Sequence, residues 1–323
     1  GGGAVQDLPG AHLRRKFMNE IGKAILEKYQ VRKTHAQKTA FIAYMKEKYP
    51  RLHVEEGGFP RCRNLVVGDP ARAKMIFGAH YDTCAVMPFP NFITPKNILF
   101  YLCYSIVMCI PFLGLGGAAA WLLSFVTDSA SALYWTFLGV YFLSFFGMML
   151  LGPPTKHTVN DNTSGVITLC ELMETLTPAQ QEQVCFVFFD HEESGLLGSK
   201  FFFKTHKAAL KNTPVINFDC VSDGDHMMLV QSKPFLKQYG GALTSAFAEA
   251  DGFTVHFEKS STTLYPSDQG NFPMSVGVAA LKRGWMGLYM DRIHTPRDTV
   301  MQEENIRYLV DSTARFVGEC GIR

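Results

Sequence analysis

One segment in the middle of the chain organises the rest: Gln183-Val-Cys-Phe-Val-Phe-Phe-Asp-His-Glu-Glu-Ser-Gly-Leu-Leu-Gly-Ser199. Its first half, Val184 to Phe189, is a continuous apolar run, which is typical of a strand covered on both faces of a sheet. The run ends abruptly in three acids and an imidazole, from Asp190 to Glu193. Carboxylates crowded at the tip of a buried strand repel one another, and this favours a nearby cation or a shared proton.

Two interpretations of Glu192 and Glu193 compete. In the structural one, both acids occupy the first turn of a helix that begins near Ser194, where the helix dipole favours negative charge. In the functional one, one glutamate ligates a metal ion while its neighbour moves protons. The remaining motifs of the chain favour the functional interpretation.

Composition limits the classes of function. The 323 residues suffice for one large domain or two small ones. The net charge is +2 and there is no long basic run, so no nucleic-acid partner is expected. The eight cysteines form no CxxC pair, and several lie in apolar runs, which indicates buried free thiols rather than a disulfide framework.

Two further apolar strands also end in polar residues. Residues 74–80 end at His80, and residues 213–219 end at Asp219. A lone histidine at a strand end is usually structural. In open α/β sheets, however, sites form beyond the carboxyl ends of the strands, so His80, Asp219 and Glu193 are expected to converge there.

Two acidic segments can support such a site. Asp82 lies two residues after His80 in an extended segment, so both side chains point to the same side, and the carboxylate can orient the imidazole or share its metal. The segment Asn160-Asp-Asn-Thr-Ser-Gly165 precedes a helical pattern. Its polar residues either cap that helix or place Asp161 where it can bridge two cations.

A long uncharged segment interrupts this pattern. Between positions 97 and 155 the only charged residue is Asp128, and the apolar runs 98–126 and 133–151 are each long enough for the roughly 20 residues that cross a bilayer. We interpret the segment as a transmembrane helical hairpin. The alternatives are a buried helical pair and a hairpin that dips into one leaflet. Lys96 and Lys156 flank the hairpin, which favours a cytoplasmic position for the rest of the chain.

Collected, these motifs resemble those of the dinuclear zinc aminopeptidase family, whose relatives include bacterial leucyl aminopeptidases, glutamate carboxypeptidases and glutaminyl cyclases. The matching segments follow one another in the family's order. They are Gly78-Ala-His-Tyr-Asp-Thr83, Asn160-Asp-Asn-Thr-Ser-Gly165, Asp190-His-Glu-Glu-Ser-Gly-Leu-Leu-Gly-Ser199, Asn217-Phe-Asp219, Ser267-Asp268 with Phe272, and His294-Thr-Pro-Arg-Asp-Thr299.

The resemblance implies two zinc ions per chain, held by two imidazoles and three carboxylates. The implied ligands are His80, Asp161 and Asp219 for one ion, and Asp161, Glu193 and His294 for the other. It also implies that Glu192 is the general base acting on a water that the ions activate. Asp298 is expected to support the loop that carries His294.

The chain departs from the family pattern at the oxyanion donor. Many relatives have a tyrosine immediately before the last histidine ligand, where this chain has Ile293. Tyr265 resembles an alternative position used elsewhere in the family, so it is the candidate donor; the competing interpretation is an ordinary loop aromatic.

Strand and helix alternation, together with the resemblance, predicts a three-layer α/β/α zinc-peptidase fold with a mixed central sheet, plus the inserted transmembrane hairpin. The predicted division is a catalytic domain at 1–96 and 152–323 and a hairpin at 97–151. Because the hairpin begins and ends close to the metal motifs, its base is expected either to wall the substrate cleft or to serve only as an anchor. Glycines in its first helix permit close helix contacts and therefore oligomers.

The predicted function is that of a membrane-anchored zinc peptidase, most simply an aminopeptidase, acting on hydrophobic or membrane-associated peptides. The competing hypothesis for an enzyme is glutaminyl-cyclase-like or N-acyl amino acid amidohydrolase activity on the same fold. A receptor that has lost its metals is a third reading, and the complete ligand set argues against it.

Overall fold

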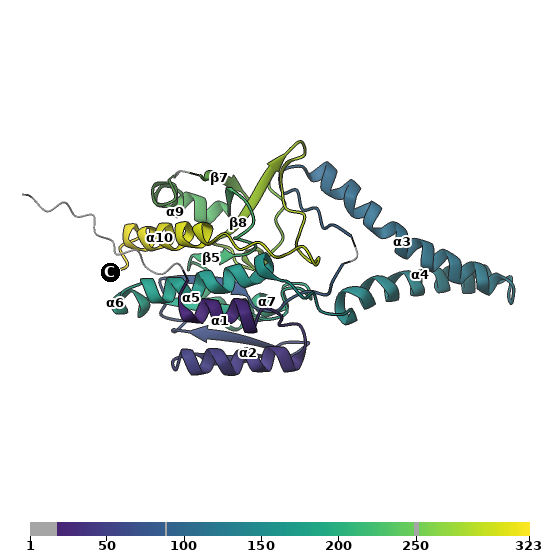
Figure 1. The fold of residues 1–323 in the computed structure, drawn as a ribbon, viewed down its shortest axis with the longest axis horizontal. Coiled ribbons are helices and arrows are strands. Elements are labelled where there is room, and N and C mark those ends of the chain that lie inside the picture. The colour runs from purple at the N-terminus through teal and green to yellow at the C-terminus, as the bar shows by residue number, and fades with distance from the viewer. Residues whose placement is uncertain (1–17, 88, 249–251) are drawn as a thin grey trace, which may run out of the picture.

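A computed structural model describes residues 18–87, 89–248 and 252–323 (Figure 1). The apolar periodicity of residues 11–29 predicts a helix that lies partly outside this range; its described part is α1, Glu20–Lys28, capped by Asn19. The pattern of residues 236–250 likewise predicts a helix; it corresponds to α9, Lys233–Ala246, and the last two predicted positions lie outside the described residues.

The described residues form one nine-stranded mixed sheet in the order β1-β2-β4-β3-β5-β8-β6-β7, with β9 paired to β8. The strands are β1 His53–Gly57, β2 Cys62–Val67, β3 Met75–His80, β4 Val184–Phe189, β5 Val215–Phe218, β6 His226–Gln231, β7 Thr254–Lys259, β8 Ser275–Gly284 and β9 Gly287–Tyr289. Strands β4, β3, β5 and β8 run parallel to one another, so their carboxyl ends meet at one edge.

The central strands are apolar because helices cover both faces of the sheet. Every residue of β3, β4 and β5 is buried. One core contains Phe77 and Phe186, and the core on the opposite face contains Ile76 and Val187. Alternate side chains of each strand therefore enter different cores, as the period-two geometry of a strand requires.

Helices α1, α2, α5, α9 and α10 pack on one face and α7 and α8 on the other, which confirms the predicted three-layer α/β/α fold (Figure 1). The bounds of the body helices not yet given are α2 His35–Lys48, α5 Gly165–Thr175, α6 Pro178–Gln181, α7 Leu197–Thr205, α8 Lys207–Leu210 and α10 Glu303–Glu319, with a 3-10 turn, η3, at Asp268–Asn271. Helix α2 begins at a capping box in which Thr34 and Gln37 satisfy each other's backbone N–H groups.

The uncharged segment forms two long helices that extend away from the body of the molecule (Figure 1). They are α3, Ile98–Ser124, and α4, Ala130–Phe146, which continues into a π-helical turn, η1, at Gly147–Leu151. Both are long and apolar enough to cross a membrane, and only 6% and 0% of their most apolar windows are buried within the chain. The alternative of a helical pair buried in this chain's own core is therefore wrong.

Both ends of the hairpin are tied to the body. At the start of α3, the side-chain amide of Asn97 donates a hydrogen bond to the backbone oxygen of Met286 at 3.2 Å. At the end of η1, Lys33 Nζ donates to the backbone oxygen of Leu150 at 2.8 Å. The hairpin therefore begins and ends in ordered contact with the residues that carry the polar motifs.

Candidate metal centre

The sequence-predicted ligands come together at the carboxyl edge of the parallel strands. His80 is the last residue of β3, Asp219 directly follows β5, and Glu193 lies four residues after the end of β4. Asp161 comes from a π-helical turn, η2, at Val159–Ser164. His294 lies in the loop after β9.

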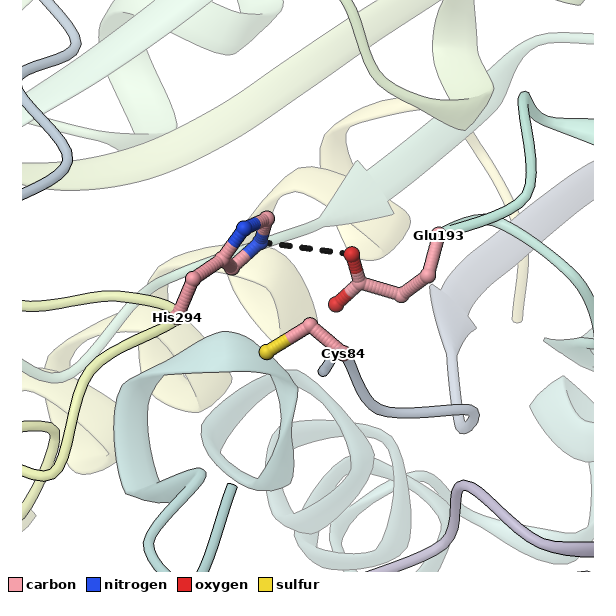
Figure 2. A group of neighbouring side chains, drawn as sticks. All are labelled: Cys84, Glu193 and His294. Carbon is pink, nitrogen blue, oxygen red and sulfur yellow. Dashed lines mark ion pairs between the residues drawn. The ribbon is translucent and has the colours of Figure 1, made fainter. Parts of the chain in front are cut away.

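Asp161 lies between the two imidazoles. Its Oδ1 is 3.3 Å from His80 Nε2, and its Oδ2 is 2.9 Å from His294 Nε2. His80 Nε2 is also 3.5 Å from Asp219 Oδ1. On the other side, His294 Nε2 is 3.2 Å from Glu193 Oε2, a pair drawn in Figure 2. The five side chains thus form two groups that share one carboxylate.

The donor chemistry of these groups fits zinc. Imidazole nitrogen and carboxylate oxygen are both ordinary zinc ligands, and zinc sites in enzymes commonly have three protein donors. Ligand atoms of His80, Asp161 and Glu193 all lie within 4.8 Å of one another. In addition, Glu193 Oε1 is buried and has no hydrogen-bond partner among the described residues. A buried anionic oxygen without a partner is costly unless a cation binds it.

The electrostatics of the site follow from burial and from charge. Burial raises the pKa of Glu192 well above its usual value, and the negative charges of Glu193 and Asp219 add to this effect, while His80 opposes it. For His80, burial disfavours the charged ring, but the facing carboxylates outweigh burial and raise its pKa. The carboxylates thus favour positive charge between them, which bound cations would supply.

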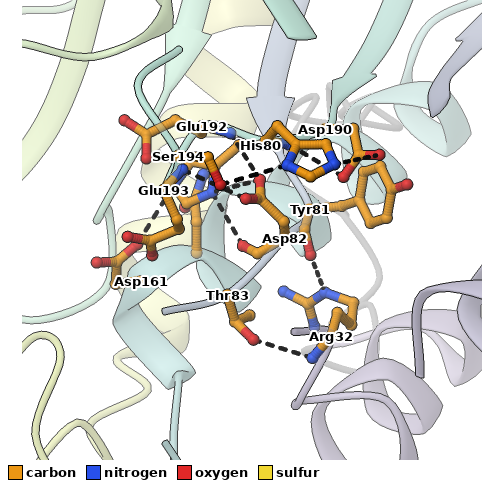
Figure 3. Close-up of polar contacts among 12 residues, drawn as sticks. Arg32, His80, Tyr81, Asp82, Thr83, Asp161, Asp190, Glu192, Glu193 and Ser194 are labelled. Atoms are coloured by element: carbon orange, nitrogen blue, oxygen red, sulfur yellow. Dashed lines mark hydrogen bonds and ion pairs between the residues drawn. The ribbon is translucent and has the colours of Figure 1, made fainter. Parts of the chain in front are cut away.

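Asp82 connects the two ends of the site (Figure 3). Its carboxylate accepts the backbone N–H of Glu192 at 3.0 Å and that of Glu193 at 3.3 Å. Its Oδ1 also lies 3.7 Å from His80 Nδ1, while its backbone oxygen lies 3.1 Å from the same nitrogen. The imidazole is therefore held by the backbone oxygen of Asp82, with the carboxylate farther away, and that carboxylate holds the double-glutamate segment.

The helical interpretation of Glu192 and Glu193 is wrong. Helix α7 begins only at Leu197, after the left-handed residue Leu196. Both acids lie in the irregular connection from β4, where Asp82 binds their backbone amides.

Asp298 holds the segment of Asp161 in the same way as Asp82 holds that of Glu192 and Glu193. Its two oxygens accept the backbone N–H groups of Asn160 at 2.7 Å and of Asp161 at 3.0 Å. Burial raises the pKa of Asp298 to about 7. Its principal contacts are thus with the Asp161 segment, whereas the sequence pointed to the loop of His294.

Tyr265 is buried beside the site. Its hydroxyl donates a hydrogen bond to the backbone oxygen of Asp219 at 3.0 Å. The hydroxyl proton of Tyr265 is therefore directed to the backbone carbonyl of the predicted ligand Asp219.

Several residues around the site carried no role in the sequence analysis. Lys38 Nζ lies 2.6 Å from Asp190 Oδ1 in a buried ion pair. Asp268 is fully buried, and burial raises its pKa to about 7. Cys84 lies beside Glu193 and His294. Lys38 lies in an ordinary polar helical segment, and Cys84 follows the His80 motif without belonging to it, so only the folded chain identifies these two residues.

A pocket of about 120 Å³ opens beside the second group of ligands. His294 and Glu193 line it on the body side, and Lys33 also faces it. Met148, Met149 and Leu150, the π-helical end of the hairpin, form another part of its lining. The foot of the hairpin is therefore in direct contact with the space next to the predicted metal ligands.

The fold is similar to that of several solved enzymes. Similarity to Macrostomum lignano glutaminyl cyclase extends over 100% of this chain and 96% of that one, with a TM-score of 0.56 and 12% identity. Similarity to the LapA aminopeptidase of Legionella pneumophila covers 94% of this chain and 70% of that one, with a TM-score of 0.53 and 13% identity. Similarity to Porphyromonas gingivalis glutaminyl cyclase covers 93% of this chain and 96% of that one, with a TM-score of 0.50 and 14% identity.

Sequence comparison gives the family. Comparison with curated protein sequences gives no match. The sequence profile described as peptidase family M28, in contrast, matches residues 145–314, just over half of the chain. This match and the shared fold confirm the resemblance inferred from the motifs: the chain belongs to peptidase family M28, a family of zinc-dependent peptidases.

Proposed function

We propose that this protein is a membrane-anchored aminopeptidase that uses two zinc ions and cleaves hydrophobic or membrane-associated peptides. The observation that carries the proposal is the position of Asp161, whose two oxygens face His80 on one side and His294 on the other. A carboxylate in that position can bridge two cations, and each cation then has three protein donors.

In this proposal the five ligands divide into two sets that share Asp161. The first set is His80, Asp161 and Asp219, and the second is Asp161, Glu193 and His294. When bound, zinc polarises a peptide carbonyl and lowers the pKa of a coordinated water. Asp82 and Asp298 hold the ligand segments in place through their backbone amides.

Glu192 is the proposed general base. Its ligand oxygen lies within 4.8 Å of the ligand atoms of His80 and Asp219, so it faces the first set. Burial raises its pKa, which makes it a stronger proton acceptor than an exposed glutamate. In the reaction, Glu192 takes a proton from water and delivers it to the leaving amine.

Tyr265 is the proposed donor to the oxyanion that develops on the carbonyl oxygen. Its hydroxyl is adjacent to Asp219, to whose backbone oxygen it donates. To stabilise an oxyanion the hydroxyl must exchange that hydrogen bond for one to the substrate.

The test compares the wild-type protein with Glu192→Gln on a peptide library read by mass spectrometry. The glutamine keeps the shape but cannot accept the proton. We expect the variant to retain its zinc and to lose at least about 10²-fold in cleavage rate. Cleavage products that lack only the first residue would establish the aminopeptidase type. Full activity in Glu192→Gln would remove the glutamate from the mechanism.

The hairpin supports the membrane part of the proposal. We propose that α3 and α4 span the bilayer as an insert at 97–151, with the catalytic part at 1–96 and 152–323 on the cytoplasmic side. Their side chains are largely exposed although they are apolar, and such a surface is stable in lipid rather than in water. Trp285 is 84% exposed and packs edge-on against Phe100, with the two ring centroids 5.5 Å apart. An exposed tryptophan at the base of the hairpin suits the boundary between membrane and water.

The second candidate function uses the same site on another amide substrate. Two of the proteins with a similar fold are named glutaminyl cyclases. Peptides with an amino-terminal glutamine distinguish the activities, because cyclisation releases ammonia without shortening the chain. N-acyl amino acids test an amidohydrolase in the same assay. Peptide shortening with two zinc ions per chain would favour the aminopeptidase.

A further inference from the structure

A thiol lies beside the second set of predicted ligands. The ligand atoms of Cys84, Glu193 and His294 all lie within 4.8 Å of one another. Figure 2 shows the three side chains converging from separate segments. Donors that share one zinc ion are about 3–4.5 Å apart, given zinc–ligand lengths of roughly 2.0–2.3 Å. Shifts of a few tenths of an ångström would therefore let one ion contact all three.

We propose that Cys84 is a fourth protein ligand of the second zinc ion. This inference rests on the proposed dinuclear site and adds to it a donor of a different chemical kind. With Asp161, Glu193 and His294, the thiolate completes four protein donors, the number typical of closed, non-catalytic zinc sites. The first ion, with His80, Asp161 and Asp219, retains an open position.

The placement of Glu192 agrees with this division of labour. Glu192 is grouped with His80 and Asp219, the ligands of the first ion, and Cys84 is grouped with the ligands of the second. The proton acceptor therefore faces the ion with the open position. The second ion would then fix the position of Asp161 and balance the negative charge of the carboxylates.

The surroundings of Cys84 suit a bound thiolate. The side chain is 5% exposed, so most of its surface is covered by protein. The hydroxyl of Thr155 lies 3.5 Å from the sulfur and can donate to it. An outer donor of this kind commonly orients a metal ligand. Zinc itself removes the proton from a coordinating thiol.

A second thiol, that of Cys220, also lies near the predicted ligands. Cys220 Sγ is 3.1 Å from Asp219 Oδ1, and that cysteine also belongs to a group with Asp161 and Asp219. Its contact partner is thus a carboxylate of the first set. Cys84 instead faces Glu193, whose Oε1 is buried without a hydrogen-bond partner among the described residues.

Cobalt(II) titration of the metal-free protein tests the inference independently of activity. Thiolate bound to Co²⁺ produces an intense charge-transfer band in the near ultraviolet, which carboxylate and imidazole ligands do not produce. We expect the band in the wild type and in Cys220→Ser, and its loss in Cys84→Ser. Zinc affinity of one of the two sites should fall at least about 10-fold in Cys84→Ser, since losing even an outer partner costs that much.

Each outcome bears on a different claim. Two bound Co²⁺ ions without the band in the wild type, or a band that survives in Cys84→Ser, would overturn the inference and leave the proposed function standing. Failure to bind Co²⁺ or Zn²⁺ at all would contradict the proposed function itself. Should Cys84→Ser not fold, Cys84→Asp keeps an anionic donor and is expected to bind both ions without the band.

Discussion

At the scale of single residues, the site depends on carboxylates that do not belong to the ligand set. Asp82 and Asp298 each accept two backbone N–H groups from the segments that carry the ligands. Two hydrogen bonds from adjacent residues to one carboxyl group fix the direction of the chain. The position of Glu192, Glu193 and Asp161 is therefore set largely by these two side chains.

Asp82→Asn tests this arrangement. The amide keeps the size of the side chain but has one acceptor oxygen instead of two, so one of the two amide bonds to the Glu192–Glu193 segment is lost. We expect zinc affinity to fall about 10–100-fold, the usual loss for an outer partner of a metal ligand. A competition titration with a chromophoric chelator measures this affinity.

The matched control is Asp69→Asn, in the turn before β3, where the carboxylate accepts the backbone N–H of Ala71. This turn precedes the first residue of β3, whereas His80 is the last. It should leave zinc affinity unchanged. Equal affinities for wild type and Asp82→Asn would show that the ligands hold their positions without the carboxylate.

At the scale of elements, irregular connections carry Glu193, Asp219 and His294, whereas His80 ends a strand and Asp161 lies in the turn η2. Four non-glycine residues among those described have left-handed backbone angles: His191, Leu196, Cys220 and His294. Each is in the site or next to it in the chain. Such conformations cost about 1–3 kcal/mol in sparsely populated regions and persist only where surrounding contacts enforce them. The sheet and the carboxylate contacts supply that enforcement.

The π-helical foot of the hairpin is the element that lines the pocket with apolar side chains. Met149→Ala removes part of that lining, and we expect kcat/KM for peptides with large apolar residues to fall about 10-fold or more, since a missing methylene in an apolar pocket costs about 1–3 kcal/mol. Small, polar peptides should be affected less. Steady-state kinetics on the two classes of peptide measure the difference.

The control for this variant is Leu143→Ala, in α4 and 75% exposed, which is outside the pocket lining. It should leave both classes of peptide unaffected. If Met149→Ala also leaves them unaffected, the hairpin serves as an anchor and does not contact substrate.

At the scale of the whole molecule, the hairpin and the α/β body are joined at the active edge of the sheet. The bridge between Ala85 and Pro154 brings the segment after His80 against the segment that leaves the hairpin. Beside this bridge, the backbone N–H of Gly152 donates a hydrogen bond to the backbone oxygen of Met148, and the backbone oxygen of Leu150 accepts one from Lys33 Nζ. If the hairpin spans a membrane and the pocket binds substrate, as proposed, these two functions meet at one junction.

Two deletions separate these roles. Replacing 98–146 by a short linker removes α3 and α4 but keeps the pocket-lining turn η1, Gly147–Leu151. We expect this variant to leave the membrane fraction after alkaline extraction and to retain cleavage of soluble peptides. Replacing 98–151 also removes the pocket lining and should in addition raise KM. A wild-type protein that is itself released by alkaline extraction would contradict the spanning hairpin.

Much of the candidate site could be predicted because its residues follow recognisable strands. His80, Asp219 and the double glutamate come directly after apolar runs, and parallel strands bring their carboxyl ends together. Strands β6, β7 and β9 were not predicted. Their pairing depends on neighbours distant in the chain, and β7 has no fully buried residue that would mark it.

The sequence by itself determined the α/β architecture, the hairpin and the identity of the residues brought to the edge of the sheet, because hydrophobic periodicity and motif order are local properties of the chain. Only the tertiary structure decided that Asp161 faces both imidazoles, that Asp298 holds the Asp161 segment and that Cys84 joins the second group. These contacts join segments that are far apart in the chain through irregular backbone, and no local pattern records the distances between them.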